Sequence, residues 1–147
     1  MSRTANLRRQ HDAAVSLVSD ILRLSCALEG QGNAYRTALL LAKLTGLLRI
    51  HFAQEDKTLY PHMIQSAHLE ASQTAAAFQQ EMGGLGATYE AFAMRWNSPE
   101  AIGSAPATFR KEAEAVFAAL ASRIERENET LYPLADEIAD GQIRRTA

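Results

Sequence analysis

The sequence predicts an all-α protein, built as an antiparallel up-down-up-down four-helix bundle. Apolar residues recur at alternating spacings of three and four, as one face of an amphipathic helix requires. This pattern covers four segments of similar length, 7–28, 34–59, 69–96 and 107–139. No segment shows the alternation typical of a strand, and most connections are short, which favours antiparallel neighbours. We expect a single domain over 1–147, with a frayed tail over about 141–147.

The first two segments carry ionisable residues on their apolar faces. His11 lies in the stripe of the first segment, and His51 and Glu55 lie in the stripe of the second. A charge on such a face is costly unless another group balances it. We expect Pro61 to end the second helix, because proline disrupts helical hydrogen bonding.

The third and fourth segments contain two further irregularities. Three glycines within 83–86 interrupt the third stripe, and they predict either a kink or a close approach of another backbone. The content of Ser, Pro and Gly predicts a long loop over 97–106. In the fourth segment Glu127 is in the apolar phase and Arg123 borders it, so a buried ion pair between them is expected.

Composition excludes several classes of protein. A formal net charge of -2 gives no basic surface for nucleic acid. The most apolar stretch, 39–50, is too short to cross a membrane and contains Lys43 and Arg49. Cys26 is the single cysteine, which predicts a buried thiol, no internal disulfide and a cytoplasmic location. No nucleophile stands with an oriented base, so we expect no enzyme.

A motif that occurs twice carries the chemistry. Residues 51–61 and 123–133 both follow the pattern His or Arg, three residues, Glu, two residues, then Thr-Leu-Tyr-Pro. The first residue and the Glu are four apart and therefore share a helix face. We expect the two tyrosines, Tyr60 and Tyr132, to pack beside their prolines.

Bundle geometry brings four candidate ligands to one end of the core. An antiparallel arrangement places the start of the first helix level with the ends of the second and fourth. Imidazole and carboxylate groups together suit iron, manganese or zinc. The predicted metal ligands are His11, His51, Glu55 and Glu127.

These motifs resemble the hemerythrin-like family, also called HHE cation-binding domains. The resemblance implies a four-helix bundle that holds an oxo-bridged di-iron centre and binds oxygen or related small ligands. It also implies ligands from a His in the first helix, matched by His11, and from His-x3-Glu in the second, matched by His51 and Glu55. Glu127 stands at the carboxylate position of the fourth helix.

Three histidines of the family pattern are missing. Phe78 and Met82 occupy the ligand positions of the third helix, where we expect core residues, and Arg123 occupies that of the fourth. Arginine keeps its proton and offers no lone pair to a metal. We therefore hypothesise an incomplete di-iron site, replaced in part by an ion pair of Arg123 with the carboxylates. The implied function is that of a non-enzymatic regulatory, accessory or signalling bundle.

Two other functions remain open. The first is a mononuclear metal protein that senses, stores or carries iron, oxygen or nitric oxide through the four predicted ligands. The second is a phosphotransfer bundle, which requires an exposed acceptor histidine; the apolar position of His51 argues against it. We expect His62 and His68 to be solvated. A protein partner or a homodimer is compatible with the sequence, which identifies neither.

Overall fold

The computed structural model describes residues 4–28 and 31–146, and this part of the chain is helical with short turns and no strand. The predicted all-α class is therefore confirmed. The predicted four-helix arrangement is coarser than the structure, because the described residues form a longer series of helical segments. In chain order these are α1 (Ala5–Ser25), α2 (Gln31–Gln54), the π-helical turn η1 (Glu55–Leu59), α3 (Tyr60–Ile64), α4 (Leu69–Met82), α5 (Leu85–Arg95), α6 (Pro99–Ser104), α7 (Pro106–Arg126), the π-helical turn η2 (Glu127–Leu131) and α8 (Tyr132–Thr146).

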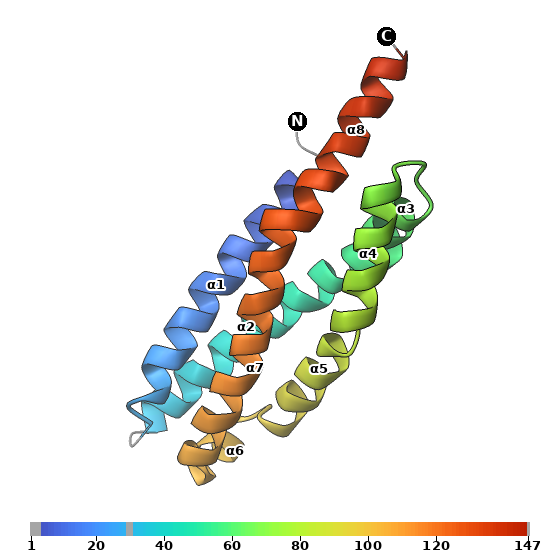
Figure 1. Ribbon diagram of the computed structural model, residues 1–147. Helices are drawn as coiled ribbons and strands as arrows, with labels where there is room; N and C mark the ends of the chain where they lie inside the picture. The colour runs from blue at the N-terminus through green and yellow to red at the C-terminus, as the bar shows by residue number, and fades with distance from the viewer. Residues whose placement is uncertain (1–3, 29–30, 147) are drawn as a thin grey trace.

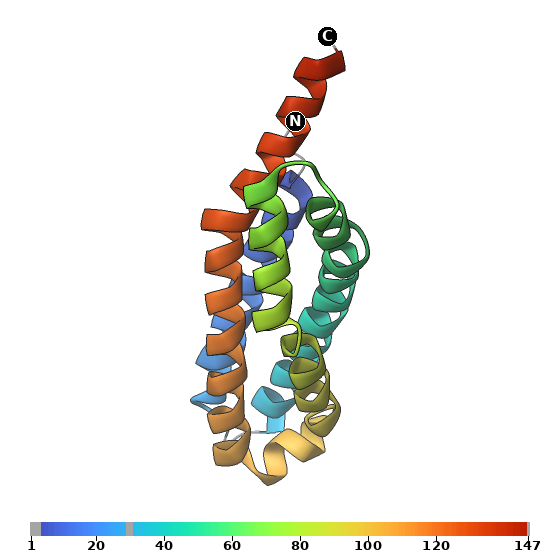
Figure 2. The same ribbon diagram turned by 45° about the vertical axis from the view of Figure 1, so that its right-hand side comes forward.

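The long helices lie lengthwise against one another. Helix α1 packs on α2 and α7, and α5 packs on α2 and α7 from the other side (Figure 1). Helix α4 continues the direction of α5 and contacts α3 and α8 (Figure 2). The short helix α6 closes one end of the molecule, and α8 extends beyond the other.

The core consists of two apolar clusters with a polar layer between them. The larger cluster includes Ala14, Leu48 and Ile124, and the smaller one includes Leu59 and Leu131. The stripes of α1, of α2 with η1, and of α7 with η2 are each interrupted by buried polar residues at the same level. The polar side chains of this layer are His11, His51, Glu55, Arg123 and Glu127.

The two Tyr-Pro sequences continue the helices instead of ending them. The backbone N–H of Tyr60 donates to the carbonyl of Glu55, five residues back, and Tyr132 donates to Glu127 in the same way. A proline ring clashes with the carbonyl four residues back in a regular α-helix, and the wider π turn relieves that clash. The prediction that Pro61 ends its helix was wrong for this reason.

Glycine breaks the third segment into α4 and α5, which confirms the predicted interruption. A Cβ atom built on Gly83 would lie 2.6 Å from the carbonyl oxygen of Gln79, so this turn excludes any larger residue.

The predicted loop 97–106 was wrong over most of its length, because it contains α6. The Ser98 side chain caps that helix by accepting from the backbone N–H of Ala101 at 3.1 Å.

The predictions for Cys26 and for two surface histidines were also wrong. Cys26 is exposed and not buried, because it lies just past the last residue of α1. His62 and His68 are half-buried instead of solvated, and the His68 ring caps α4 by accepting from the backbone N–H of Ala71. Helix α8 runs to Thr146, and the fraying of about 141–147 stays a prediction.

No helix in the described ranges combines the length and the apolar character needed to span a bilayer.

Candidate metal centre

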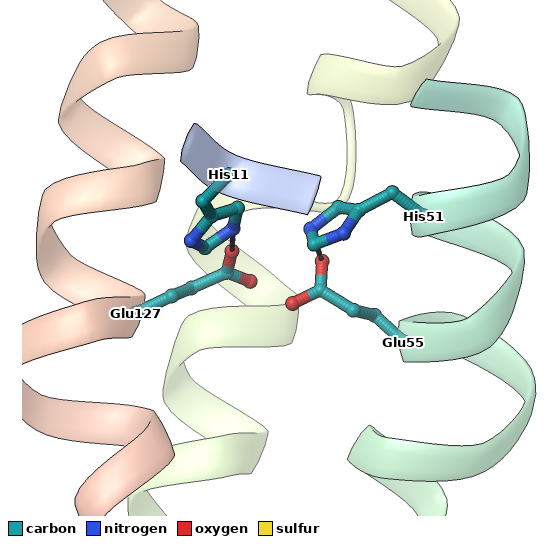
Figure 3. Close-up of side chains that lie close together, drawn as sticks. All are labelled: His11, His51, Glu55 and Glu127. Atoms are coloured by element: carbon teal, nitrogen blue, oxygen red, sulfur yellow. Dashed lines mark hydrogen bonds and ion pairs between the residues drawn. The ribbon is translucent and has the colours of Figure 1, made fainter. Parts of the chain in front are cut away.

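The four predicted ligands lie together in the polar layer. His11 comes from α1, His51 from the last turn of α2, and Glu55 and Glu127 from the first positions of η1 and η2 (Figure 3). One potential ligand atom from each side chain lies within 4.8 Å of the others. All four side chains are at most 2% exposed.

Each imidazole faces one carboxylate. The Nε2 atom of His11 lies 3.1 Å from Oε1 of Glu127, and Nε2 of His51 lies 3.1 Å from Oε1 of Glu55. The two carboxylates approach each other from opposite sides of the core (Figure 3). The site therefore presents two ring nitrogens and two carboxylate oxygens to the same small volume.

The outer ring nitrogens are held by amide side chains. Nδ1 of His11 lies 2.8 Å from Oδ1 of Asn128, and Nδ1 of His51 lies 2.7 Å from Oε1 of Gln10. The Gln10 amide nitrogen donates to Gln54 at 3.0 Å, which turns its oxygen toward the ring. Because an amide oxygen only accepts, each Nδ1 atom donates its proton outward, so Nε2 is the ring nitrogen that faces the cluster. Metal-bound histidines are oriented in this way.

His51 Nε2 is the only fully buried side-chain polar atom in the described part of the chain that lacks a hydrogen-bond partner. Its neighbour, the Glu55 oxygen, is also an electron-pair donor, so the two lone pairs repel. Burial and then the nearby His11 lower the pKa of His51 to about 4, so a proton does not fill the gap at neutral pH. A metal cation between the two atoms would remove the repulsion, and the residues present fit such an ion.

Tyr60 and Tyr132 belong to the site, although the sequence predicted only packing beside proline for them. The Tyr60 hydroxyl donates to Oε2 of Glu127 at 2.8 Å, and the Tyr132 hydroxyl donates to Oε2 of Glu55 at 2.7 Å. Each copy of the motif thus holds the carboxylate of the other copy. Burial, followed by the two carboxylates, raises the pKa of both phenols, which remain protonated donors.

The feature of the sequence that could have placed the two tyrosines in the site is that both copies of the motif carry a tyrosine at the same position. In a π turn, residues five apart come close to the same helix face, which a regular α-helix does not allow. Gln10 and Asn128 were also missed. Each is next in the sequence to a candidate ligand, His11 or Glu127, but both are half-buried and follow no apolar periodicity.

Replacing Tyr132 with phenylalanine should lower the free energy of unfolding by about 1–3 kcal/mol, because it leaves a buried carboxylate oxygen without its donor. Chemical denaturation of the metal-free protein measures this loss. Tyr35→Phe, at a side chain that is 57% exposed, is the matched control and should change little. Equal effects of the two substitutions would show that the Tyr132 hydrogen bond contributes nothing.

Arg123 completes the polar layer. Its Nη2 lies 3.1 Å from Oε1 of Glu55, its Nε lies 3.2 Å from Oε2 of Glu127, and its Nη1 lies 3.5 Å from the carbonyl oxygen of Met82. The guanidinium carbon stands 4.6 Å from the centre of the Phe52 ring. Burial alone would lower the pKa of Arg123, but the two carboxylates outweigh it and raise that pKa, so the positive charge is permanent.

Comparison with known proteins identifies the family. The sequence-family model for the hemerythrin HHE cation-binding domain matches residues 2–135. The chain belongs to this family. No curated protein and no solved structure matched the chain. Phe78, at a position for which the sequence resemblance implies a histidine ligand, is buried in the smaller apolar cluster as predicted.

The charge balance of this hemerythrin-family site favours uptake of a cation. Burial is the main cause that raises the pKa of Glu127, and the neighbouring Glu55 raises it further, while His11 and Arg123 lower it. One arginine does not fully balance two buried carboxylates. Either a proton or a metal ion stabilises the remaining negative charge.

Proposed function

We propose that this hemerythrin-family protein is a non-enzymatic bundle that binds one first-row transition metal ion, with iron as the family's expected metal. The ligands are His11, His51, Glu55 and Glu127, and Arg123 stands where a second metal would need an imidazole. The four helical runs 5–25, 31–64, 69–95 and 106–146 act as the four helices of an up-down-up-down bundle. The unpartnered lone pair of His51 Nε2, directed into the cluster, is the observation that carries this proposal.

The spacing of the donor atoms supports a single ion. Ligand atoms that share one ion at 2.0–2.2 Å lie about 3–4 Å from each other. The two imidazole–carboxylate distances are both 3.1 Å, and all four ligand atoms lie within 4.8 Å of one another, so the longest separations would have to shorten slightly around an ion. The amide groups of Gln10 and Asn128 supply the outer hydrogen bonds that orient both imidazoles with Nε2 toward the cluster. A bound iron would supply one-electron exchange and Lewis acidity at this position.

A second metal ion is opposed by the residues that stand where the family resemblance implies its ligands. Arg123 already contacts both of them, and its guanidinium cannot act as a ligand. Phe78 offers no donor atom. The Met82 thioether is a soft, weak donor, and it sits on a half-buried side chain. This asymmetry supports one metal per chain instead of the family's pair.

Metal binding itself is better supported than binding of oxygen or nitric oxide. The pocket beside the cluster, between Gln10, Phe52 and Leu120, has no room for a water-sized molecule. A small gaseous ligand would therefore require side chains to move. We infer a role in which metal occupancy regulates the bundle or stores the ion.

A metal-free, ion-paired core is the second candidate. The observation in its favour is that Arg123 pairs with both carboxylates and supplies positive charge without any ion. In that case the bundle would act through a partner alone.

Titration with Co²⁺, whose visible bands report imidazole and carboxylate coordination, separates the candidates. The metal-stripped protein should saturate at one equivalent of Co²⁺ per chain. Absence of any coordination spectrum would support the metal-free candidate. Saturation at two equivalents would show that Arg123 does not exclude the second ion.

A further inference from the structure

We propose that Arg123 makes this centre selective for divalent over trivalent ions, so that bound iron is held in the ferrous state. The inference rests on the proposed metal site and adds the oxidation state of the ion that the site accepts.

The contacts of Arg123 fix its charge beside the ligands. The guanidinium lies 3.1 Å from Glu55 and 3.2 Å from Glu127, the two carboxylates of the ligand set. Its side chain is 5% exposed and lies against the Phe52 ring. It has little freedom to turn away from an incoming cation or to be screened by solvent.

The net charge of the site predicts a preference for divalent over trivalent ions. Two ligand carboxylates and the adjacent guanidinium give the site a net charge of about -1 when both imidazoles are neutral. A divalent ion brings the buried site to about +1 and a trivalent ion to about +2, and an uncompensated buried charge is increasingly costly. Repulsion from Arg123 also grows with the charge of the ion. Both effects penalise the trivalent state more.

The hydrogen bonds donated to the two ligand carboxylates also favour a divalent ion. Arg123 and the phenols of Tyr60 and Tyr132 all donate to the two ligand carboxylates. These donors withdraw electron density from the oxygens and make them weaker ligands. A trivalent ion depends more strongly on carboxylate donation than a divalent ion, so it loses more.

The reduction potential of bound iron tests this inference, because a purely structural ion pair would not control it. Iron-loaded wild type and Arg123→Met are titrated with ferricyanide and dithionite through mediators, and each iron exchanges one electron. Removing the charge should favour the ferric state at least tenfold, which lowers the potential by about 59 mV or more. Arg123→Lys keeps a positive charge and should stay closer to the wild type than Arg123→Met does.

A second measurement covers the case in which Arg123→Met does not fold. Wild-type protein loaded with Co²⁺ is challenged with the redox-inert trivalent ion Ga³⁺ as its citrate complex. The Co²⁺ spectrum should persist when the total concentrations of Co²⁺ and Ga³⁺ are equal. Replacement of bound Co²⁺ by Ga³⁺ would overturn the inference.

The outcomes separate this inference from the proposed function. One iron per chain with a potential that changes by less than about 18 mV, a twofold change in the ratio of affinities, would overturn the inference alone. A wild-type chain that binds neither iron nor Co²⁺ would overturn the proposed function together with the inference.

Discussion

Arg123→Met should lower the free energy of unfolding of the metal-free protein by about 3–5 kcal/mol. The substitution removes the shared cation from Glu55 and Glu127, whose side chains are 0% and 1% exposed. Two neighbouring carboxylates are then left buried without a balancing charge. Urea denaturation followed by circular dichroism, with the metal stripped from both proteins, measures the difference.

Helix α7 supplies the matched control. Arg110 and Glu114 form an ion pair with the same spacing of four residues and a distance of 3.2 Å, but both side chains are at least half exposed. Arg110→Met should therefore cost at most about 1 kcal/mol. If the two methionine variants lose the same stability, the buried ion pair has no special role in the fold.

His51→Gln should weaken binding of Co²⁺ by on the order of 100-fold or more, since one of four ligands is lost. Glutamine offers no imidazole lone pair to the ion. It also cannot reproduce the hydrogen bond from Nδ1 to Gln10 that orients the ring. Competition against a chelator of known affinity, read by the visible spectrum, gives the two dissociation constants.

His62→Gln is the control for that experiment. His62 is half-buried on α3, outside the group of four ligand residues. Its variant should bind Co²⁺ as the wild type does. A similar loss of affinity in both variants would mean that the metal is held elsewhere, and an unchanged affinity in His51→Gln would exclude His51 as a ligand.

The sequence was sufficient for the helical class and for the layer of candidate ligands. Both rest on local periodicity, because a residue in phase with an apolar stripe must face the core. His11, His51, Glu55 and Glu127 were identified in this way, and the structure brings them within 4.8 Å of one another. The predicted pairing of Arg123 with Glu55 and Glu127 also agrees with the observed distances.

The remaining features depend on tertiary contacts that periodicity does not encode. Proline usually ends a helix, and the compensation by a π turn before Tyr60 and Tyr132 involves backbone hydrogen bonds that the sequence pattern does not specify. The exchange of tyrosines between the two motifs follows from those turns. Gln10 and Asn128 form hydrogen bonds with histidines of other helices, so no spacing within one helix could reveal their role.

The number of iron ions bound per folded chain tests the central claim most directly. Native mass spectrometry of protein purified from iron-supplemented cells, kept free of oxygen, gives this number together with the protein mass. We predict one iron per chain and no oxo-to-iron charge-transfer band after exposure to air. Two irons per chain with that band would contradict the claim that Arg123 replaces the second metal, and no iron would contradict the metal site itself.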